Sequence, residues 1–492
     1  MIECAENLCR SGEDVTLAYC SGISDVCREN PHGNPVLCAF CRTVRRSLLK
    51  GISSRIRCCP LGSGMRKQER AFAFKDSAEL KKVPYGEVMA GCAVLSSYIT
   101  ATRNSRPDCK NGATRKYFQH CLNAVADLAD WARDFIAREG ITDIHLFNGR
   151  LMDNRALYDL AISRGLSFHS NEVVGGWRTR EDFRRIVYEG GLPHNLQVNR
   201  TMAEKLWSDP KVGMDEKVSI GRDFYERRRH NQIAGDRVYT SGQTAGLLPE
   251  GFDRTKRNIV IFNSSEDEFV ALGKDFDDYQ MFPNQTAGIV YLLEHLPSEE
   301  FHVYVRVHPN LTRIKYDYVR ELYELPKKFG NLTVIAPDSQ VSTYALMDAA
   351  EKVVVFGSTA GAEATYSGKP VILVGPSFYR FLDVAHTPET PQAFVECAQT
   401  VGLCAKPVET ALKYAYFILQ RKRLAVDCRY VDLSVKPVRF LSRTYYITGY
   451  AKLFGSYILM KFVRALLFRL FWHSGRRSFG DHLFEEHVYD AS

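Results

Sequence analysis

The middle of the chain alternates short apolar runs with segments of helical periodicity. Strands are predicted at 258–263, 301–307, 332–335, 352–356 and 370–374, and helices at 286–296, 316–329, 341–350 and 360–367. Strands that alternate with helices of this length form βαβ units around a parallel sheet. Right-handed crossovers bring the loops that follow the strands to the carboxyl edge of the sheet, where ligands bind. We therefore expect a ligand site among the residues that end these strands.

The first half of the chain follows a weaker version of the same pattern. Strands are predicted at 15–19, 141–147 and 166–169, and helices at 117–138 and 155–164. A polar segment rich in Gly and Pro, 232–257, indicates a linker. The pattern predicts an α/β protein with two Rossmann-like domains facing a cleft. We place the domains at 1–240 and 252–412, followed by a basic, aromatic, helical tail at 413–492.

Composition narrows the class of protein. The chain has 492 residues, of which 45% are hydrophobic and 25% charged, as in ordinary soluble proteins. It contains no apolar run of the ~18 residues that a membrane-spanning helix needs, and its N-terminal segment has no signal-peptide pattern. Its 14 cysteines, without a secretory signal, indicate thiols in a reducing compartment. We therefore expect a cytoplasmic protein.

The charge of the chain is concentrated near its end. The formal net charge is +8, but Lys413 to Arg477 holds far more Lys and Arg than Asp and Glu, so the rest of the chain is slightly acidic. Basic and aromatic side chains suit an anionic membrane surface, which would make the protein peripheral at the inner face of the cytoplasmic membrane. A helix packed on the domains, with Lys and Arg reaching to solvent, fits equally well. No nucleic-acid-binding module is recognisable, so nucleic acid is not expected as a partner.

Two motifs end strands of the predicted C-terminal sheet. In the first, 356–371, the turn Gly357-Ser358-Thr359 leads into a helix and would suit a phosphate, while Glu363 could accept from a sugar hydroxyl. An ordinary N-cap at Ser358 or Thr359 explains the same turn. In the second motif, Arg306 and His308 precede Pro309, and both suit a phosphate or a departing nucleotide.

Together these motifs resemble the C-terminal domain of GT-B glycosyltransferases, most closely bacterial capsule and surface-polysaccharide biosynthesis proteins. Those proteins also carry a strand that ends in Ser-Ser with acids after it, here Ser264-Ser265, and a Gln that enters the next helix, here Gln285. The resemblance implies a nucleotide-sugar donor, an acceptor that is a polysaccharide or lipid-linked, and no required cofactor. It further implies that His308 acts in catalysis and that the donor is held by Ser264, Ser265, Arg306, Ser358, Thr359, Gly361 and Glu363.

Other functions share parts of this pattern. Non-hydrolysing nucleotide-sugar epimerases carry a second Glu after the first, whereas here Glu363 is followed by Ala364, which disfavours that activity. Polyol-phosphate transferases of the teichoic-acid type share the Arg-x-His-Pro element. A non-catalytic partner of a polysaccharide assembly machine is a further alternative, because a fold does not fix the chemistry.

The acceptor side is predicted in the N-terminal domain. Asn148 and Arg150 follow the strand 141–147 and would line the cleft. A general base that activates the acceptor hydroxyl could be Asp153, Glu172 or His194, and for each a surface or capping role is the simpler explanation.

Four N-terminal cysteines suggest a metal site. Cys20, Cys27, Cys38 and Cys41 include a C-x2-C pair, and four thiolates could hold a structural zinc ion. A run of buried thiols is the alternative.

The start of the chain indicates a missing element. Residues 2–9 resemble the second half of an amphipathic helix, and 15–19 would then be the second strand of its domain. We therefore expect the natural protein to begin about 20 residues earlier, with one more strand. A sheet that is one strand smaller is the alternative.

Overall fold

The structure is a computed structural model. It describes the chain except residues 23, 25, 29, 32, 66, 174–183, 233, 235–237, 313, 315, 427–434, 441–442 and 449–492. Two compact units are formed. The first consists of Met1–Pro193 with the described part of Leu424–Ser492, and the second of His194–Arg423.

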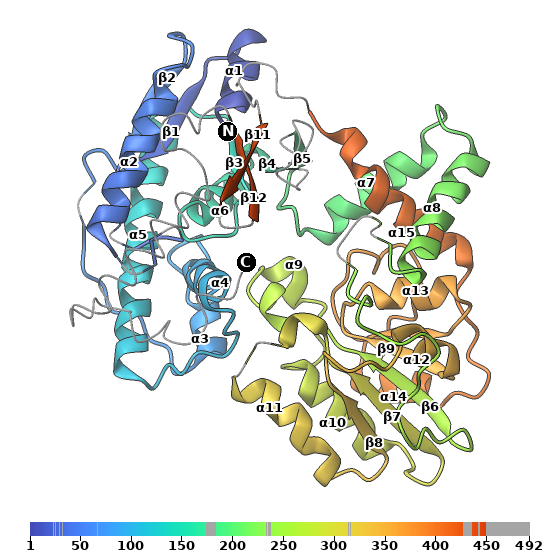
Figure 1. The fold of residues 1–492 in the computed structure, drawn as a ribbon. Helices are drawn as coiled ribbons and strands as arrows, with labels where there is room; N and C mark the ends of the chain where they lie inside the picture. The colour runs from blue at the N-terminus through green and yellow to red at the C-terminus, as the bar shows by residue number, and fades with distance from the viewer. Residues whose placement is uncertain are drawn as a thin grey trace. The chain divides into compact units, whose positions relative to one another are not determined.

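The second unit is built on a five-stranded parallel sheet (Figure 1). Its strands are β6 (Arg257–Phe262), β7 (Phe301–Arg306), β8 (Leu332–Ile335), β9 (Lys352–Val355) and β10 (Val371–Leu373). Their order across the sheet is β10-β9-β6-β7-β8, with every pairing parallel. The strands are continuous apolar runs because helices cover both faces. The predicted α/β class is confirmed, and all five predicted strands are present.

Helices cover the two faces of this sheet. On one face α10 (Gln285–His295), α11 (Asp317–Glu324) and α14 (Pro391–Gln399) pack through Leu292, Leu322 and Phe394. On the other face lie α12 (Thr343–Ala349) and α13 (Ala360–Tyr366). A Cβ on Gly361 of α13 would come within 2.9 Å of Val355 Cγ2, so glycine permits the close approach of helix and strand.

The second unit begins well before the linker expected near residue 240. The helices α7 (Leu196–Ser208) and α8 (Met214–Arg229) pack against α15 (Val408–Gln420). Tyr225 OH donates to Ala411 O at 2.7 Å, and a Cβ on Gly221 would lie 2.8 Å from Leu412 O. This close contact places α7 and α8 with the following domain rather than the preceding one. The short helix α9 (Lys274–Asp277) also belongs to this unit.

The first unit contains small sheets and several helices. Strands β1 (Thr16–Cys20) and β2 (Arg57–Leu61) are parallel, as are β3 (Asp143–Phe147) and β4 (Ser167–Val173), while β5 (Arg185–Glu189) is antiparallel to β4. The helices are α1 (Ile2–Arg10), α2 (Pro35–Leu49), α3 (Ser77–Lys82), α4 (Ala90–Thr102), α5 (Gly112–Glu139) and α6 (Arg155–Ser163). The strands and helices predicted for this half are present, but α2, α3, α4, β2 and β5 were not anticipated.

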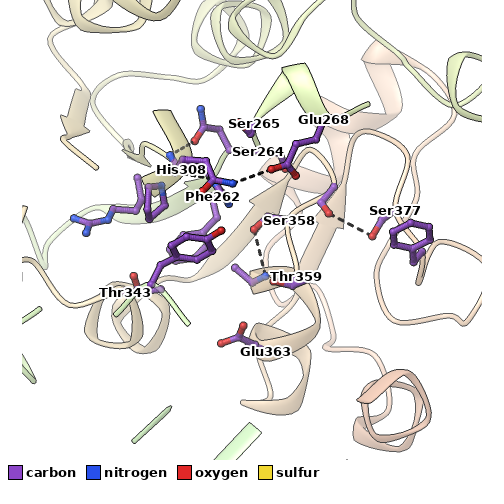
Figure 2. A pocket seen from close by; sticks show the side chains of 18 of the residues that line it. Phe262, Ser264, Ser265, Glu268, His308, Thr343, Ser358, Thr359, Glu363 and Ser377 are labelled. Carbon is purple, nitrogen blue, oxygen red and sulfur yellow. Dashed lines mark hydrogen bonds between the residues drawn. The ribbon is translucent and has the colours of Figure 1, made fainter. Parts of the chain in front are cut away.

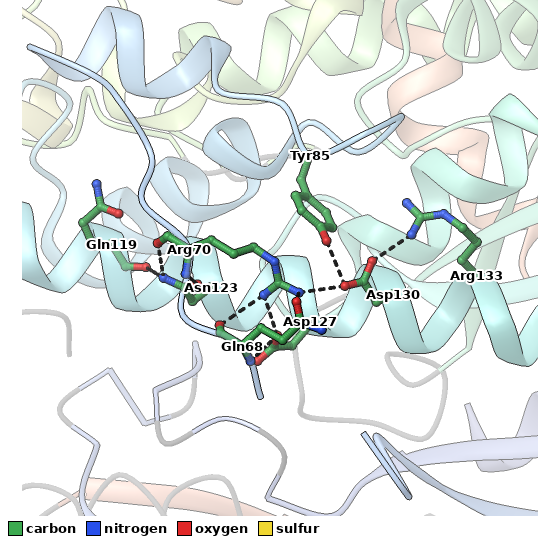
Figure 3. Close-up of polar contacts among 8 residues, drawn as sticks. All are labelled: Gln68, Arg70, Tyr85, Gln119, Asn123, Asp127, Asp130 and Arg133. Atoms are coloured by element: carbon green, nitrogen blue, oxygen red, sulfur yellow. Dashed lines mark hydrogen bonds and ion pairs between the residues drawn. The ribbon is translucent and has the colours of Figure 1, made fainter. Parts of the chain in front are cut away.

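An extended segment of the first unit is held along α5 by a ladder of side chains (Figure 3). Asn123 accepts from Arg70 N at 2.7 Å and donates to Arg70 O at 3.0 Å. Gln119 makes the same pair of bonds with the backbone of Phe72, and Asp127 accepts from Gln68 N at 3.2 Å. Four helical residues rise ~6 Å and two extended residues ~6.6 Å, so the two periods match. The Arg70 guanidinium closes the ladder with ion pairs to Asp127 and Asp130, both at 2.7 Å.

The C-terminal segment differs from the predicted helical tail. Strands β11 (Val435–Phe440) and β12 (Arg443–Thr448) form an antiparallel pair there. Both are rich in β-branched and aromatic residues, which favour strands over helices. The remainder of the tail, 449–492, lies outside the described residues, and so does the predicted aromatic helix within it. None of the described helices is long and apolar enough to cross a membrane.

Candidate functional site

A cavity of about 560 Å³ lies at the carboxyl ends of β6, β7 and β9, within the range of small-molecule sites. Figure 2 shows side chains that follow these strands gathered around it. It brings together most of the predicted donor residues and two candidate catalytic residues. Those lining it are His194, Ser264, Ser265, Arg306, His308, Ser358, Thr359 and Glu363. Gly361 is the donor candidate that does not line the cavity.

The loop after β6 is fixed by Gln285, the residue that opens α10. Gln285 Oε1 accepts from Ser264 N at 2.8 Å, and its Nε2 donates to Ser264 O at 3.1 Å. This paired contact explains why a Ser-Ser strand end and a Gln occur together in the motif. Ser264 Oγ is buried and has no hydrogen-bond partner among the described residues, so it is available to a ligand in the cavity.

The loop after β9 makes a tight turn that only glycine allows. Gly357 has φ +125°, and a Cβ there would lie 2.6 Å from Pro376 O. Ser358 Oγ accepts from Ala360 N at 3.3 Å, whereas Thr359, the N-cap residue of α13, makes no side-chain capping bond. Gly361 has a packing role, because a Cβ there would come within 2.4 Å of Tyr379 OH.

Arg306 ends β7 as a buried cation. Its side chain is 4% exposed, and Nη2 donates to Ser339 O at 3.0 Å. Neither Nε nor Nη1 has a hydrogen-bond partner among the described residues. Burial lowers the pKa of Arg306, although Asp338 and Tyr323 act against the shift. A buried guanidinium with two unsatisfied groups is costly by itself and is satisfied by an anion.

His308 is held with one ring nitrogen toward the backbone of Asn310. Its Nδ1 accepts from Asn310 N at 3.2 Å, and its backbone N–H donates to Asn263 Oδ1 at 2.7 Å. When Nδ1 is an acceptor, the proton of the neutral ring sits on Nε2. The ring of Tyr239 packs edge-on at 5.5 Å between centroids. The ring is therefore oriented as a hydrogen-bond donor through Nε2.

Glu363 is a buried carboxylate with two protein donors. Arg228 Nε donates to Oε1 at 3.0 Å, and Tyr344 OH donates to Oε2 at 2.6 Å. Burial, together with the charge of Glu363, raises the pKa of Tyr344, so this hydroxyl keeps its proton and remains a donor. Each carboxylate oxygen retains acceptor capacity for a ligand hydroxyl.

Several residues of the cavity were missed by sequence reasoning. One wall is apolar and aromatic, and it comes from the loops and the short helix that follow the strands; it is formed by Phe269, Leu272, Phe276 and Phe378. Arg228 comes from α8, more than a hundred residues from Glu363 in the chain. No local pattern marks Arg228. Asn263, a polar residue at the end of an apolar strand, could have been noticed.

The predicted acceptor-side residues lie in the first unit, except His194, which lies in the second. Asn148 and Gly149 turn at the end of β3 with φ +61° and +93°. The Asn148 side-chain amide donates to Glu172 of β4. Burial raises the pKa of Glu172, while Asn148 and Arg150 act to lower it. Asp153 is exposed and precedes α6. The structure thus brings Asn148, Arg150 and Glu172 to one sheet edge.

The four N-terminal cysteines are spread over different elements. Cys20 ends β1, Cys27 lies in a turn, and Cys38 and Cys41 lie on the helix α2. Across the described residues, no three of these thiols converge as ligands of one ion. Zinc at these cysteines stays a prediction.

Comparison with known proteins identifies the domain that holds the cavity. Residues 250–394 match the family model of capsule polysaccharide biosynthesis proteins. Among solved structures, the β-Kdo 2,4 transferase of Thermosulfurimonas dismutans KpsC is similar at 15% identity, covering 56% of this chain and 80% of that chain with a TM-score of 0.34. The β-Kdo 2,7 transferase of the same protein is similar at 16% identity. The match covers 60% of this chain and 89% of that chain, with a TM-score of 0.33. The UDP-GlcNAc 2-epimerase of Neisseria meningitidis is similar at 11% identity. The match covers 62% of this chain and 80% of that chain, with a TM-score of 0.27.

No curated protein matches the chain. The family match spans all five strands of the second sheet and the strand-end loops that carry Ser264, His308 and Ser358. The resemblance expected from the Ser-Ser, His-Pro and 358–364 motifs is confirmed. The part of the chain that forms the cavity-bearing sheet, residues 250–394, is therefore similar to capsule polysaccharide biosynthesis proteins.

Proposed function

We propose that the protein is a glycosyltransferase that moves a sugar from a nucleotide-activated donor to a growing capsule glycan. The observation that carries this proposal is Arg306. A buried guanidinium with two unsatisfied N–H groups beside an open cavity is suited to bind an anionic ligand. The phosphates of a nucleotide sugar supply that anion, and the hydroxyl groups of Ser264 and Ser358 add further hydrogen-bonding groups on the same cavity.

His308 and Arg306 would act on the leaving group. As the bond between the sugar and the phosphate breaks, negative charge grows on the phosphate oxygen. Nε2–H of His308 donates toward this charge, and Arg306 neutralises it. Both groups are already oriented by protein contacts, so little reorganisation is needed during the reaction. The rate gain comes from positioning and charge stabilisation.

Glu363 and the aromatic wall would hold the rest of the donor. Glu363 accepts from a ribose or sugar hydroxyl through the acceptor capacity that Arg228 and Tyr344 leave open. The aromatic wall offers ring faces and edges to the nucleobase. Thr359, at the turn before α13, would offer its hydroxyl to the donor.

Glu172 is the general base that we propose for the acceptor. A carboxyl whose pKa is raised by burial is a stronger base than an exposed one, and it takes the proton from the attacking hydroxyl. Asn148 holds its position, and Arg150 lies near enough to act on it electrostatically. His194 lies in the donor cavity beside Phe276, with ring centroids 6.5 Å apart, which suits donor binding better than proton abstraction.

The test is a donor screen with the full-length protein. Sugars activated by CMP, UDP, GDP and CDP are supplied, with Kdo among them because two similar structures are Kdo transferases. Release of nucleotide that depends on a capsule oligosaccharide supports transfer. Interconversion of a donor without an acceptor would indicate an epimerase instead. Binding of nucleotide without any turnover would favour a non-catalytic partner.

A further inference from the structure

A cluster of two imidazoles and one carboxylate lies in the first unit. Asp143 and His145 are two residues apart on β3, so their side chains share a face, and His169 is the direct partner of His145 on β4. Asp143 is the first residue of β3, and His145 and His169 are the third residues of β3 and β4, so the cluster lies toward the amino edge of the sheet. The acceptor-side residues Asn148 and Glu172 lie at the opposite, carboxyl edge, so the cluster has no role in the proposed transfer.

The ligand atoms of this cluster converge. His145 Nε2 lies 3.1 Å from Asp143 Oδ1, and His169 Nε2 lies 3.2 Å from Asp143 Oδ2. The three ligand atoms all lie within 4.8 Å of one another. In a tetrahedral zinc site with bonds of about 2.0 Å, neighbouring ligand atoms are ~3.3 Å apart. The two nitrogen–oxygen separations, one to each oxygen of Asp143, are close to this edge length.

Neighbouring contacts orient the two imidazole rings. The two imidazole rings are stacked at 4.4 Å with an interplanar angle of 13°, so both rings are fixed by each other and by strand register. Cys4 Sγ of α1 lies 3.5 Å from His145 Nδ1, the nitrogen that faces away from Asp143. An outer partner on the second ring nitrogen sets the tautomer of a metal-binding histidine.

The composition and access of the cluster favour zinc. We propose that Asp143, His145 and His169 bind a zinc ion, with water in the fourth position. Two imidazole nitrogens and one carboxylate oxygen form a common zinc ligand set, whereas Mg²⁺ and Ca²⁺ prefer oxygen alone. Asp143 is exposed, which gives the ion an entry path. Ser167 Oγ lies 3.1 Å from His169 Nε2, so it is a polar neighbour of the same ligand atom. Arg185 is close enough to act on His145 electrostatically, and the site binds zinc against that charge.

The test measures zinc in the full-length protein after dialysis against zinc and then against buffer. The wild type should retain about one equivalent, as expected for a preformed site. His145→Ala combined with His169→Ala should retain none while keeping the wild-type circular dichroism spectrum. His230→Ala, at an exposed helix end, is the matched control and should retain zinc like the wild type.

A second measurement separates this site from the N-terminal cysteines. Cobalt bound in place of zinc at His and Asp ligands should show visible bands but no thiolate charge-transfer band in the near ultraviolet. Cys38→Ser with Cys41→Ser should leave zinc content unchanged. Loss of zinc in this cysteine variant, a thiolate band, retention by the double histidine variant, or a folded wild type that retains no zinc would each overturn the proposal.

Discussion

Replacing Arg306 with Met should weaken ligand binding without destabilising the protein, whereas most substitutions of buried residues lower stability. Methionine replaces the aliphatic part of the side chain, is shorter, and removes a charge at a residue that is 4% exposed and only partly hydrogen-bonded. Because a buried charge without full compensation is costly, the ligand-free variant should be as stable as the wild type or more stable by up to about 3 kcal/mol.

Nucleotide binding should weaken strongly in the same variant. If Nε and Nη1 both donate to phosphate, two charge-assisted hydrogen bonds are lost, each of about 1.5–3 kcal/mol. The sum, ~3–6 kcal/mol, corresponds to roughly a 10²- to 10⁴-fold rise in the Kd for the nucleotide. The thermal stabilisation that saturating nucleotide gives the wild type should therefore disappear at the same concentration.

The assay is a thermal melt with and without each nucleotide, backed by calorimetric titration. Arg257→Met is the matched control, because Arg257 begins the neighbouring strand β6 and is paired with Glu300 and Glu351, both at 2.7 Å. The control should melt earlier and still bind nucleotide. An Arg306→Met protein that binds nucleotide like the wild type would refute the phosphate assignment, and one that melts much earlier would show that Arg306 is structural.

Three further predictions follow from other parts of the molecule. The hydrogen bond from Arg257 holds the pKa of Glu351 at about 2 instead of 4.5. The stability that this shift gives is present above about pH 4.5 and is lost as the pH falls toward 2. Arg257→Met should therefore reduce the fall of the melting temperature between pH 4.5 and 2. Asn123→Ala leaves Arg70 N and O without their partner and should cost about 1–3 kcal/mol in urea unfolding; an unchanged midpoint would contradict the ladder. Glu172→Gln should abolish transfer but not donor binding, and wild-type transfer should fall on the acid side at a pH above the ordinary Glu pKa, because burial raises the pKa of the base.

The predicted binding of the basic tail to a membrane surface can also be tested. If 413–492 binds an anionic membrane surface, the full chain should pellet with anionic vesicles at low salt and be released at high salt, because ions screen surface charge. A chain that ends at residue 436 should not pellet. Equal pelleting by both chains would contradict a role for the tail.

The sequence by itself determined the second sheet and the edge at which ligands bind. Buried strands such as 352–355 must be apolar on both faces, and the helices between them must show the 3.6-residue period, so both signals are local. The motifs at the strand ends share one edge because parallel strands with right-handed crossovers leave no other choice. The prediction that Ser264, His308 and Ser358 lie together needed no distances.

Only the tertiary structure decided how those side chains are partnered. Arg228 reaches Glu363 because α8 packs on α15, a contact between segments far apart in the chain that no local pattern encodes. The lack of a hydrogen-bond partner for Nε and Nη1 of Arg306 among the described residues also depends on long-range packing, which the sequence does not reveal. Cys38 and Cys41 suggested a metal site and lie on a helix, whereas His145 and His169 meet because strand register makes residues 24 apart direct neighbours. Local propensity chooses the elements, but long-range packing chooses which polar groups meet, because burial forces each of them to find a partner.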